Sequence, residues 1–561
     1  MPTSWYQAVS VILDKVIEER PESILDIGVG FGKYGVMLRE AFDIPYYRYA
    51  KESWFVRIDG VEAFESYKNP IHDYVYDNIY YQPIEECIDS LGKYDVILMI
   101  DILEHFDKET GKALLQKIVS HANKAVIIST PVKPSVQGEY LGNIFETHRS
   151  KWFVKDFQQF DIHFSLLDIY DNQALIVKIY PNELVPQKNE TLLSLDGYLC
   201  DNIQPIGNIE LKEKLHVAYV LPHKYITGGM KMLLEQIKWL RSRGHIVVAY
   251  LKGSADNQSA IPDWSDAKAD KDVVIPYEHS YSQYIRDYDV IVAGWQGQIP
   301  ELMHCNSPVM YWEQGHEPFF GDFTRVSTMN RNASKMLYSL PVYFTAVSDF
   351  VADILLNRYG RKTVVIPNGV DTDVFYLGNH AYNNTILLVG NPTYPFKNFR
   401  AAVTALNILW RRGCRFKVNW VCQLAPSFSG IEFPLNIILN PPQNKIPEHY
   451  RDADIFLFTS MYEGFGMPPL EAMASGLPTV CTDCGGVNMY IRPGENALLV
   501  DGGDVQAIAN ALSFLLENEN ARKVLSENAR KTALEFSLNH SLSALENVLY
   551  HIKKGANKEQ A

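Results

Sequence analysis

The sequence predicts an α/β protein made of several Rossmann-like units. Short apolar runs alternate with helix-like stretches in three series, at about residues 24–180, 216–370 and 385–500, and this alternation is typical of parallel sheets. The chain has 561 residues, and at roughly 150 residues per domain three or four compact units are expected. Hydrophobic residues make up 47% and charged residues 21% of the chain, which suits units that each bury their own core.

The elements follow one another in a regular order. In the first series, strands are expected at residues 23–27, 56–61, 94–100, 124–129 and 174–179. The second series begins with HVAYVLP at His216 and the third with TILLVG at Thr385, and a helical pattern over 507–552 closes the chain. Residues 186–212 lose the alternation and are rich in Asn, Pro and Gly, which predicts a linker. The expected domains are 1–185, 213–375 and 376–553, with a linker at 186–212 and a frayed polar tail at 554–561.

Charge and composition exclude several classes of protein. With 52 Lys+Arg against 66 Asp+Glu, the formal charge is -14, which argues against nucleic acid as a partner. Seven scattered cysteines favour a reducing compartment, the cytoplasm. No uncharged apolar run approaches the roughly 18 residues that span a bilayer, so any membrane contact is expected to be peripheral, at the inner face. The sequence assigns no oligomeric state.

The segment ILDIGVGFGKYG places Asp26, Gly28, Gly30 and Gly32 at a strand-to-helix turn. Glycines there let a ligand approach the backbone, and a nucleotide or nucleoside is the expected ligand. Gly30, Gly32 and Gly35 also have the G-x-G-x-x-G spacing of a dinucleotide site, so that alternative stays open.

Together with YDVILMIDILEHF (94–106), this segment makes residues 20–180 resemble the class I S-adenosylmethionine-dependent methyltransferases. The resemblance implies that the glycine loop holds the methionine part of S-adenosylmethionine. It also implies that an acid after the second strand binds the ribose: Glu62, with Asp59 as the alternative. Asp101 is assigned to the cofactor site. The candidate bases for deprotonating the methyl acceptor are Asp101, Glu104, His105 and His148. For His105 and His148 a helix-capping or pocket-wall role is favoured over that of the base.

A second constellation lies in the later series. Gly228 and Gly229 begin a predicted helix, whose amide groups favour an anion. Far along the chain, Glu463 and Glu471 bracket the glycine-rich turn before another helix. Both carboxylates are therefore expected to address hydroxyl groups of one polyol ligand.

The string EGFGMPPLEAM around these glutamates resembles retaining glycosyltransferases of the GT-B fold, family four, and the likeness covers about residues 214–553. The resemblance implies that Glu463 contacts the transferred sugar and that Glu471 binds the nucleotide ribose. It further implies that Lys397 neutralises the diphosphate and that His316 lines the cleft near the reacting sugar. The backbone amides expected to hold the sugar and diphosphate belong to Gly464, Phe465, Gly466 and Met467.

Two positions depart from the pattern of these relatives. Asn391 stands where they carry an arginine, and Arg400 is expected to replace that charge; Met489 stands where they carry an acid. No Asp-x-Asp pair lies beside the diphosphate candidates, so no metal is expected for the glycosyltransferase.

The sequence thus predicts a bifunctional enzyme in surface polysaccharide or glycoprotein glycan synthesis. Its expected ligands are S-adenosylmethionine, a nucleotide-sugar donor and a glycan, glycolipid or glycoprotein acceptor. Two alternatives remain for the first domain: a methyltransferase-like scaffold without turnover, or an NAD-dependent sugar oxidoreductase.

Overall fold

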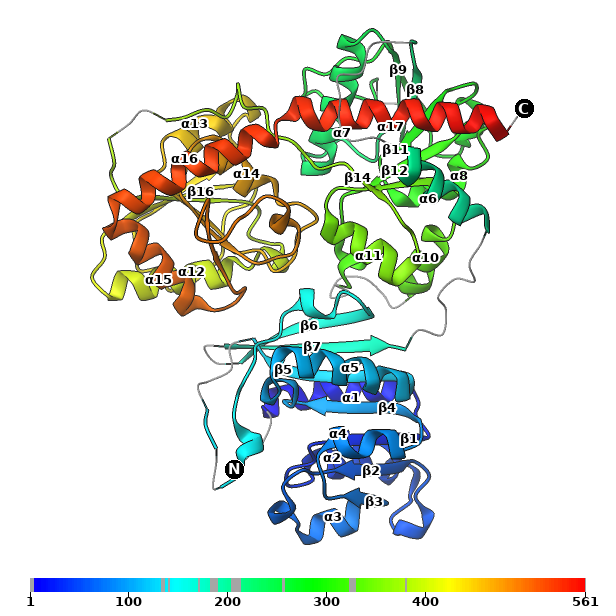
Figure 1. The fold of residues 1–561 in the computed structure, drawn as a ribbon, viewed down its shortest axis with the longest axis vertical. Coiled ribbons are helices and arrows are strands. Elements are labelled where there is room, and N and C mark those ends of the chain that lie inside the picture. The colour runs from blue at the N-terminus through cyan, green and yellow to red at the C-terminus, as the bar shows by residue number, and fades with distance from the viewer. Residues whose placement is uncertain are drawn as a thin grey trace. The chain divides into compact units, whose positions relative to one another are not determined.

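The computed structural model describes residues 5–132, 137–139, 142–169, 172–181, 190–202, 213–254, 258–321, 329–378 and 381–559. The chain divides into two compact units. The first unit contains Met1–Leu184 and Glu317–Thr328, and the second contains Val185–His316 and Met329–Ala561. Each unit is an α/β structure with helices packed on its sheets (Figure 1).

The first unit has one seven-stranded sheet in the order β3-β2-β1-β4-β5-β7-β6. Strands β1 to β5 are parallel, whereas β7 runs antiparallel to both of its neighbours, β5 and β6. The strands are β1 (Ser23–Ile27), β2 (Arg57–Val61), β3 (Asn78–Tyr80), β4 (Tyr94–Ile100), β5 (Ala122–Pro131), β6 (Asp161–Ile169) and β7 (Asn172–Tyr180). The helices are α1 (Val9–Glu18), α2 (Lys33–Phe42), α3 (Pro70–Val75), α4 (Ile84–Cys87), α5 (Lys108–His121) and α9 (Glu317–Phe320).

The central strands of this sheet read as apolar runs because they are covered on both faces. In β4 every residue except Asp95 is buried. Helix α5 begins where the Asp107 carboxylate accepts a hydrogen bond from the Thr110 amide at 3.0 Å, which satisfies one of the unpaired donors of the first turn.

A short segment from the middle of the chain belongs to the first unit. The Gln158 side chain donates to the Phe320 carbonyl at 3.0 Å, and the Phe164 amide of β6 donates to the Gly321 carbonyl, also at 3.0 Å. Phe319 and Phe320 of α9 are buried. Residues 317–321 fall inside the range 213–375 that the sequence assigns to another domain, so this boundary prediction needs correction.

The second unit contains two all-parallel sheets, in an N-terminal half and a C-terminal half. The sheet of the N-terminal half has the order β10-β9-β8-β11-β12-β13-β14. Its strands are β8 (His216–Val220), β9 (Ile246–Gly253), β10 (Lys271–Pro276), β11 (Val290–Ala293), β12 (Val309–Glu313), β13 (Tyr343–Ala346) and β14 (Val364–Val365). Its helices are α6 (Glu190–Asn202), α7 (Gly228–Ser242), α8 (Ile299–Leu302), α10 (Met329–Tyr338) and α11 (Asp349–Tyr359).

The sheet of the C-terminal half has the order β17-β16-β15-β18-β19-β20. Its strands are β15 (Thr385–Val389), β16 (Lys417–Cys422), β17 (Leu435–Leu439), β18 (Ile455–Phe458), β19 (Thr479–Thr482) and β20 (Leu498–Val500). Its helices are α12 (Phe399–Arg411), α13 (Ile446–Arg451), α14 (Met467–Ala474), α15 (Val505–Glu517) and α16 (Glu519–Glu535), and the last helix of the chain is α17 (Leu538–Glu559). In a parallel sheet the loops after the strands share one edge, which is where ligands of such folds bind.

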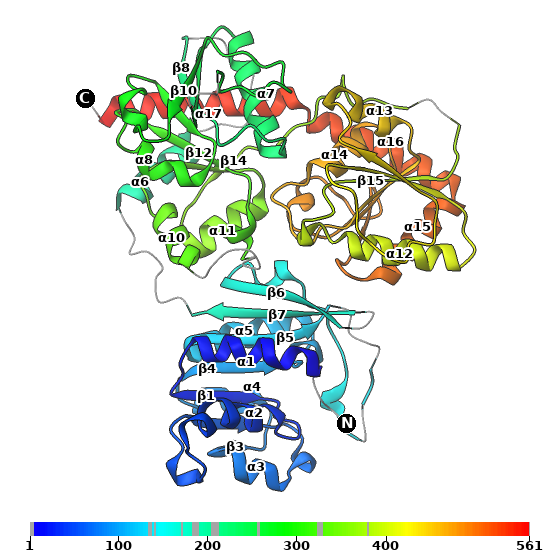
Figure 2. The ribbon, with the colours of Figure 1, turned by 180° about the vertical axis from the view of Figure 1, so that it is seen from behind.

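The chain runs between the two halves twice, and the two crossings lie side by side. The Val370 amide donates to the Phe536 carbonyl at 3.0 Å, and the Leu538 amide donates to the Val370 carbonyl at 2.8 Å. Helix α17 then returns to the N-terminal half, where its Glu546 carboxylate accepts from the Trp239 indole at 2.9 Å. Figure 2 shows α17 beside α7 from behind, as Figure 1 does from the front.

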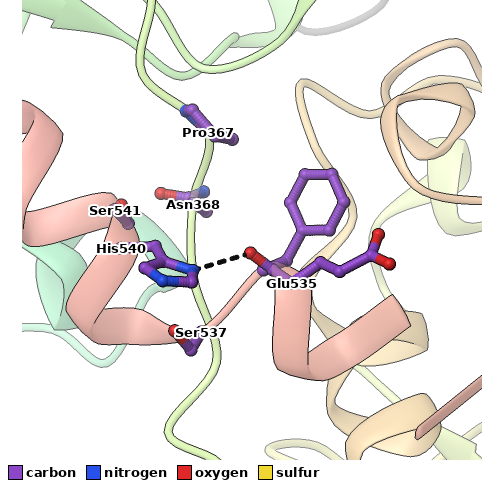
Figure 3. Close-up of a pocket in the computed structure, with 7 residues that line it drawn as sticks. Pro367, Asn368, Glu535, Ser537, His540 and Ser541 are labelled. Carbon is purple, nitrogen blue, oxygen red and sulfur yellow. Dashed lines mark hydrogen bonds between the residues drawn. The ribbon is translucent and has the colours of Figure 1, made fainter. Parts of the chain in front are cut away.

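A pocket of ≈ 300 Å³ lies at these crossings (Figure 3). The His540 ring donates from Nδ1 to the Glu535 carbonyl at 3.0 Å at its wall. The pocket is lined by Pro367, Asn368, Glu535, Phe536, Ser537, His540 and Ser541. None of these is a residue that the sequence assigns to a site.

Two predicted irregular segments are partly helical. The expected linker at 186–212 contains α6, whose Asp196 forms a buried ion pair with Arg361 at 2.8 Å; residues 182–189 and 203–212 lie outside the described residues. The expected tail at 554–561 continues α17 as far as Glu559. No described helix combines the length and the apolar character needed to cross a bilayer.

Candidate functional site

The glycine loop of the first unit adopts the backbone that the sequence predicts. It connects β1 to α2, and Gly28, Gly30 and Gly32 have φ angles of 76°, 53° and 86°, which other residues rarely adopt. The Gly28 amide donates to the Val61 carbonyl of β2 at 2.8 Å. A Cβ on Gly28 would stand 2.1 Å from Cδ1 of Ile102, so the loop after β4 also requires glycine here.

Of the two acids considered for the ribose, only Glu62 touches the glycine loop. It follows β2, and its two carboxylate oxygens accept from the amides of Gly30 at 2.9 Å and Phe64 at 3.0 Å. Asp59, by contrast, is fully buried within β2 and is held by Arg57, Tyr94 and Asn78. Asp59 therefore performs a structural task.

The carboxyl groups near this loop are buried, and burial changes their acidity. Asp26 accepts from the Tyr76 hydroxyl at 2.6 Å, and burial raises the pKa of Asp26 to about 6. Burial likewise raises the pKa of Glu62 to about 7. Asp101 follows β4 with a φ of 55° and accepts from the Ser129 hydroxyl at 2.8 Å. The pKa of Asp101 is also raised by burial.

The two histidines considered as bases lie together. The ring centroids of His105 and His148 are 5.0 Å apart. Burial, with the nearby His148, lowers the pKa of His105 to about 4. His105 is therefore neutral at physiological pH.

In the second unit, the structure brings Lys397 and Glu463 into contact across 66 residues of sequence. The Lys397 ammonium donates to Oε1 of Glu463 at 2.6 Å, and the Ser460 hydroxyl donates to the same oxygen at 2.8 Å. Lys397 ends a 3-10 turn (Pro395–Lys397) between β15 and α12. Arg400 lies on the first turn of α12, and its side chain is exposed.

The loop that carries Glu463 is fixed by glycines. Gly466 precedes α14 with a φ of 83°, and its carbonyl accepts from the Tyr490 hydroxyl. The Gly486 amide donates to the Glu463 carbonyl at 3.1 Å. A Cβ on Gly486 would lie 2.4 Å from the Gly464 oxygen and 2.5 Å from the Glu463 oxygen.

The remaining residues of this loop differ in what they offer a ligand. The Phe465 ring is buried against Tyr490, with centroids 5.2 Å apart, so only its backbone could contact a ligand. Met467 is the first residue of α14 and is half-buried. Glu471 lies on α14, and its Oε2 accepts from the Tyr450 hydroxyl at 2.7 Å.

In the N-terminal half, Gly228 and Gly229 begin α7, as predicted. Thr227 caps the helix by accepting from the Met230 amide at 3.2 Å. A Cβ on Gly229 would contact the Gln314 side chain at 3.4 Å, and a Cβ on Gly464 would lie 1.9 Å from the Gln314 carbonyl oxygen. Gln314 thus approaches both glycine turns. In the sequence, the only indication of this role is that Gln314 lies close to His316, and a single glutamine matches no known motif.

His316 is part of a buried polar network after β12. Its Nε2 lies 3.1 Å from the Tyr338 hydroxyl, which also donates to Glu313. Burial lowers the pKa of His316 to about 3 and raises the pKa of Glu313 to about 7. The neutral imidazole can exchange hydrogen bonds with a sugar hydroxyl, whereas Glu313 is fully buried and holds Tyr338 in place.

The substitution Glu313→Gln is expected to reduce the pH dependence of stability between about pH 5 and 8. In the folded chain the pKa of Glu313 is about 7, whereas a glutamate in water has a pKa of 4.5. The folded state therefore holds the proton more tightly than the unfolded state, and stability falls as the pH rises through this window. The difference corresponds to at most about 3 kcal/mol. Thermal unfolding midpoints of both proteins at pH 5 and pH 8 test this. The midpoint of the variant should rise relative to that of the wild type from pH 5 to pH 8. A difference between the two midpoints that does not depend on pH would contradict the raised pKa of Glu313.

The comparisons with known proteins concern the second unit. The family model described as Glycosyltransferase Family 4 matches residues 226–374, and the model described as Glycosyl transferases group 1 matches residues 430–532. The D-inositol 3-phosphate glycosyltransferase of Corynebacterium glutamicum (strain R) is 36% identical over 343 residues, which are 58% of this chain and 70% of that protein.

Other similar proteins match over shorter stretches or at lower identity. The D-inositol 3-phosphate glycosyltransferase of Geodermatophilus obscurus is 32% identical over 222 residues, 34% of this chain, and the match spans about half (48%) of that protein. The crystal structure of Anabaena HepE in complex with UDP and glucose is 18% identical, with a TM-score of 0.49, and covers 60% of this chain and 99% of that chain. Through the residues of its second unit, the chain belongs to the group 1, family 4 glycosyltransferases.

Proposed function

We propose that the second unit transfers a sugar from a nucleotide-sugar donor to a hydroxyl group of an acceptor, with retention at the anomeric carbon. The contact between Lys397 and Glu463 at 2.6 Å carries this proposal. It combines a cation suited to a diphosphate with a carboxylate suited to a sugar, beside the N-terminus of α14.

In this proposal the donor divides the ion pair. The diphosphate takes the Lys397 ammonium and the amides at the start of α14, as phosphates do at helix N-termini. Glu463 then turns to the hydroxyl groups of the sugar, and Ser460 keeps its carboxylate oriented. Positive charge placed where the leaving phosphate gains negative charge lowers the barrier. These residues supply the charge without a metal ion.

The names of the relatives support a proposal for the acceptor class. Two of them are named for D-inositol 3-phosphate, a phosphorylated polyol, and another is an MMP α-(1→4)-mannosyltransferase. We therefore propose a hydroxyl-rich acceptor for this chain, either a polyol or a glycan. The neutral His316 ring supports the proposal, because it can position a hydroxyl without adding charge.

For the first unit, we propose S-adenosylmethionine binding and methyl transfer to a hydroxyl of the same class of acceptor. The support is the glycine loop with Glu62 beside Gly30. A dinucleotide-binding sheet has parallel strands in the order 3-2-1-4-5-6, whereas here the antiparallel β7 separates β5 from β6. The NAD-dependent alternative is therefore less well supported. The scaffold alternative predicts that calorimetry detects no binding of S-adenosylmethionine.

The substitution Glu62→Ala is expected to weaken S-adenosylmethionine binding about ten- to hundredfold, because hydrogen bonds to a charged group contribute about 1.5–3 kcal/mol. Sugar transfer should not change, since Glu62 belongs to the other unit. Titration calorimetry measures the affinity, and Glu65→Ala, an exposed glutamate three residues later, is the control. Equal affinity of the Glu62 variant and wild type would remove Glu62 from the site.

The substitution Glu471→Ala is expected to raise the KM for the donor while kcat stays within about twofold. This pattern is typical of losing a contact that binds the ground state and the transition state equally. The proposed partner of Glu471 is the ribose, which does not react. Tyr450→Phe removes only the hydroxyl that holds Glu471 at 2.7 Å, so a smaller rise in KM is expected. Steady-state kinetics on both variants is the measurement. A fall in kcat at constant KM would assign Glu471 to the reacting sugar instead.

A further inference from the structure

Three side chains of the first unit that the sequence offers as candidate bases converge after β4, and the sequence predicts no metal site there. Potential ligand atoms of Glu104, His105 and His148 all lie within 4.8 Å of one another. Glu104 and His105 belong to the 3-10 turn Leu103–His105, and His148 comes from the segment after the turn Ile144–Glu146. We propose that these three residues form a binding site for a divalent transition-metal ion.

The strongest indication is the state of Glu104. Its side chain is 1% exposed, yet its Oε2 atom has no hydrogen-bond partner among the described residues. No lysine or arginine in the described part of the chain forms an ion pair with it. A buried carboxylate without a cation is costly. A metal ion would supply the missing positive charge.

The surroundings of His105 suit a metal ligand. Its Nδ1 lies 3.3 Å from the Thr147 carbonyl oxygen, which can only accept, and in the tautomer that donates there the lone pair is on Nε2. A ligating histidine typically donates its other ring N–H to a carbonyl or carboxylate in this manner.

The two segments that carry the three side chains are tied together by backbone contacts. The Glu104 carbonyl accepts from the amides of Arg149 at 2.7 Å and Ser150 at 3.1 Å. The buried Trp152 indole donates to the Leu103 carbonyl at 3.0 Å. The ligands are therefore held close to each other before any ion binds, which lowers the entropy lost on binding.

The donor set indicates the class of ion. Two imidazoles and one carboxylate suit Zn²⁺, Mn²⁺, Fe²⁺ or Co²⁺ better than Ca²⁺ or Mg²⁺, which prefer oxygen ligands. Ligands bound at about 2.0–2.2 Å lie at most about 4.4 Å apart, so small side-chain rotations bring the three atoms into range. Three protein ligands leave coordination positions open, as in catalytic rather than structural sites.

The chemical role of the site rests on the proposed methyltransferase function of this unit. The acceptor hydroxyl would bind the ion at an open position, which lowers its pKa, and its proton would pass to water. The oxygen then forms a bond to the methyl carbon, while the S–C bond of the sulfonium breaks and leaves its electron pair on sulfur. In this role His105 and His148 act as ligands and not as bases, because their lone pairs are on the ion.

The test is a metal titration of the full chain after chelator treatment and dialysis. Zn²⁺ binding is followed by calorimetry, and Co²⁺ is used as a spectroscopic probe through its visible absorption. We expect Glu104→Gln and His148→Ala each to weaken binding at the site at least tenfold and to change the Co²⁺ spectrum. Glu109→Gln, an exposed glutamate on α5, should behave like wild type.

S-adenosylmethionine affinity, measured on the same proteins, separates this proposal from the proposed function. Retained affinity in Glu104→Gln shows that the unit is folded, so a lost metal site then supports the proposal. Equal Zn²⁺ affinity and equal Co²⁺ spectra in wild type and both variants would overturn it. Metal binding that depends on Glu104 and His148 in a wild-type chain with no affinity for S-adenosylmethionine would support the site and reject the methyltransferase.

Discussion

The substitution Glu463→Ala is expected to lower kcat for sugar transfer by about 10²–10³-fold, which is the loss typical of removing a group that stabilises charge in the transition state. The KM for the donor should change little, because Lys397 and the start of α14 remain to bind the diphosphate. Glu463 is the partner of both Lys397 and Ser460, so its removal takes away the charge presented to the sugar and leaves the Lys397 ammonium available to the diphosphate. Steady-state kinetics with the identified donor measures both constants.

The control for this variant is Glu448→Ala. Glu448 is a partly exposed glutamate of the same half and also pairs with a lysine, Lys445, at 2.6 Å. It should retain wild-type kinetics, as most exposed ion pairs contribute little. Wild-type kinetics in Glu463→Ala as well would reject the proposed role of this loop.

The substitution Gly486→Ala is expected to reduce the sugar-transfer activity about tenfold to a hundredfold and to destabilise the C-terminal half by about 1–3 kcal/mol. The added Cβ would stand within 2.5 Å of backbone atoms of Glu463 and Gly464. Backbone atoms cannot move aside as a flexible side chain can, so the loop that carries Glu463 must shift. Thermal unfolding and kinetics on the variant measure the two effects.

Gly502→Ala is the matched control, because its Cβ would only reach ordinary contact with Thr482 at 3.9 Å. This variant should keep both activity and stability. If Gly486→Ala unfolds at the wild-type temperature and retains full activity, the loop is not held as described.

The sequence predicts most of the central strands because burial on both faces makes them apolar. The range 94–100 coincides with β4, and 174–179 lies within β7. Strand β6 was not predicted, because DIHFSLLDI lies at the edge of the sheet and mixes polar with apolar residues. Helix α6 was also missed, since its Asp196 is held by Arg361, 165 residues away.

The site residues divide in the same way. Glycines with a left-handed backbone, such as Gly28 and Gly466, are visible in the sequence because other residues rarely adopt that conformation. The approach of Gln314 to two glycine turns depends on tertiary packing and leaves no local pattern. The same holds for the Oε2 atom of Glu104, whose burial without a hydrogen-bond partner depends on the surrounding fold.

We propose that the chain carries two separate ligand sites, one in each unit. The most direct test is titration calorimetry of wild type, Glu62→Ala and Lys397→Ala with S-adenosylmethionine and with the nucleotide sugar found by a thermal-shift screen, in which a bound ligand raises the midpoint. We predict that Glu62→Ala loses affinity for S-adenosylmethionine alone and that Lys397→Ala loses affinity for the nucleotide sugar alone. Loss of both affinities in either variant, or no binding of S-adenosylmethionine to the wild type, would contradict the presence of two separate sites.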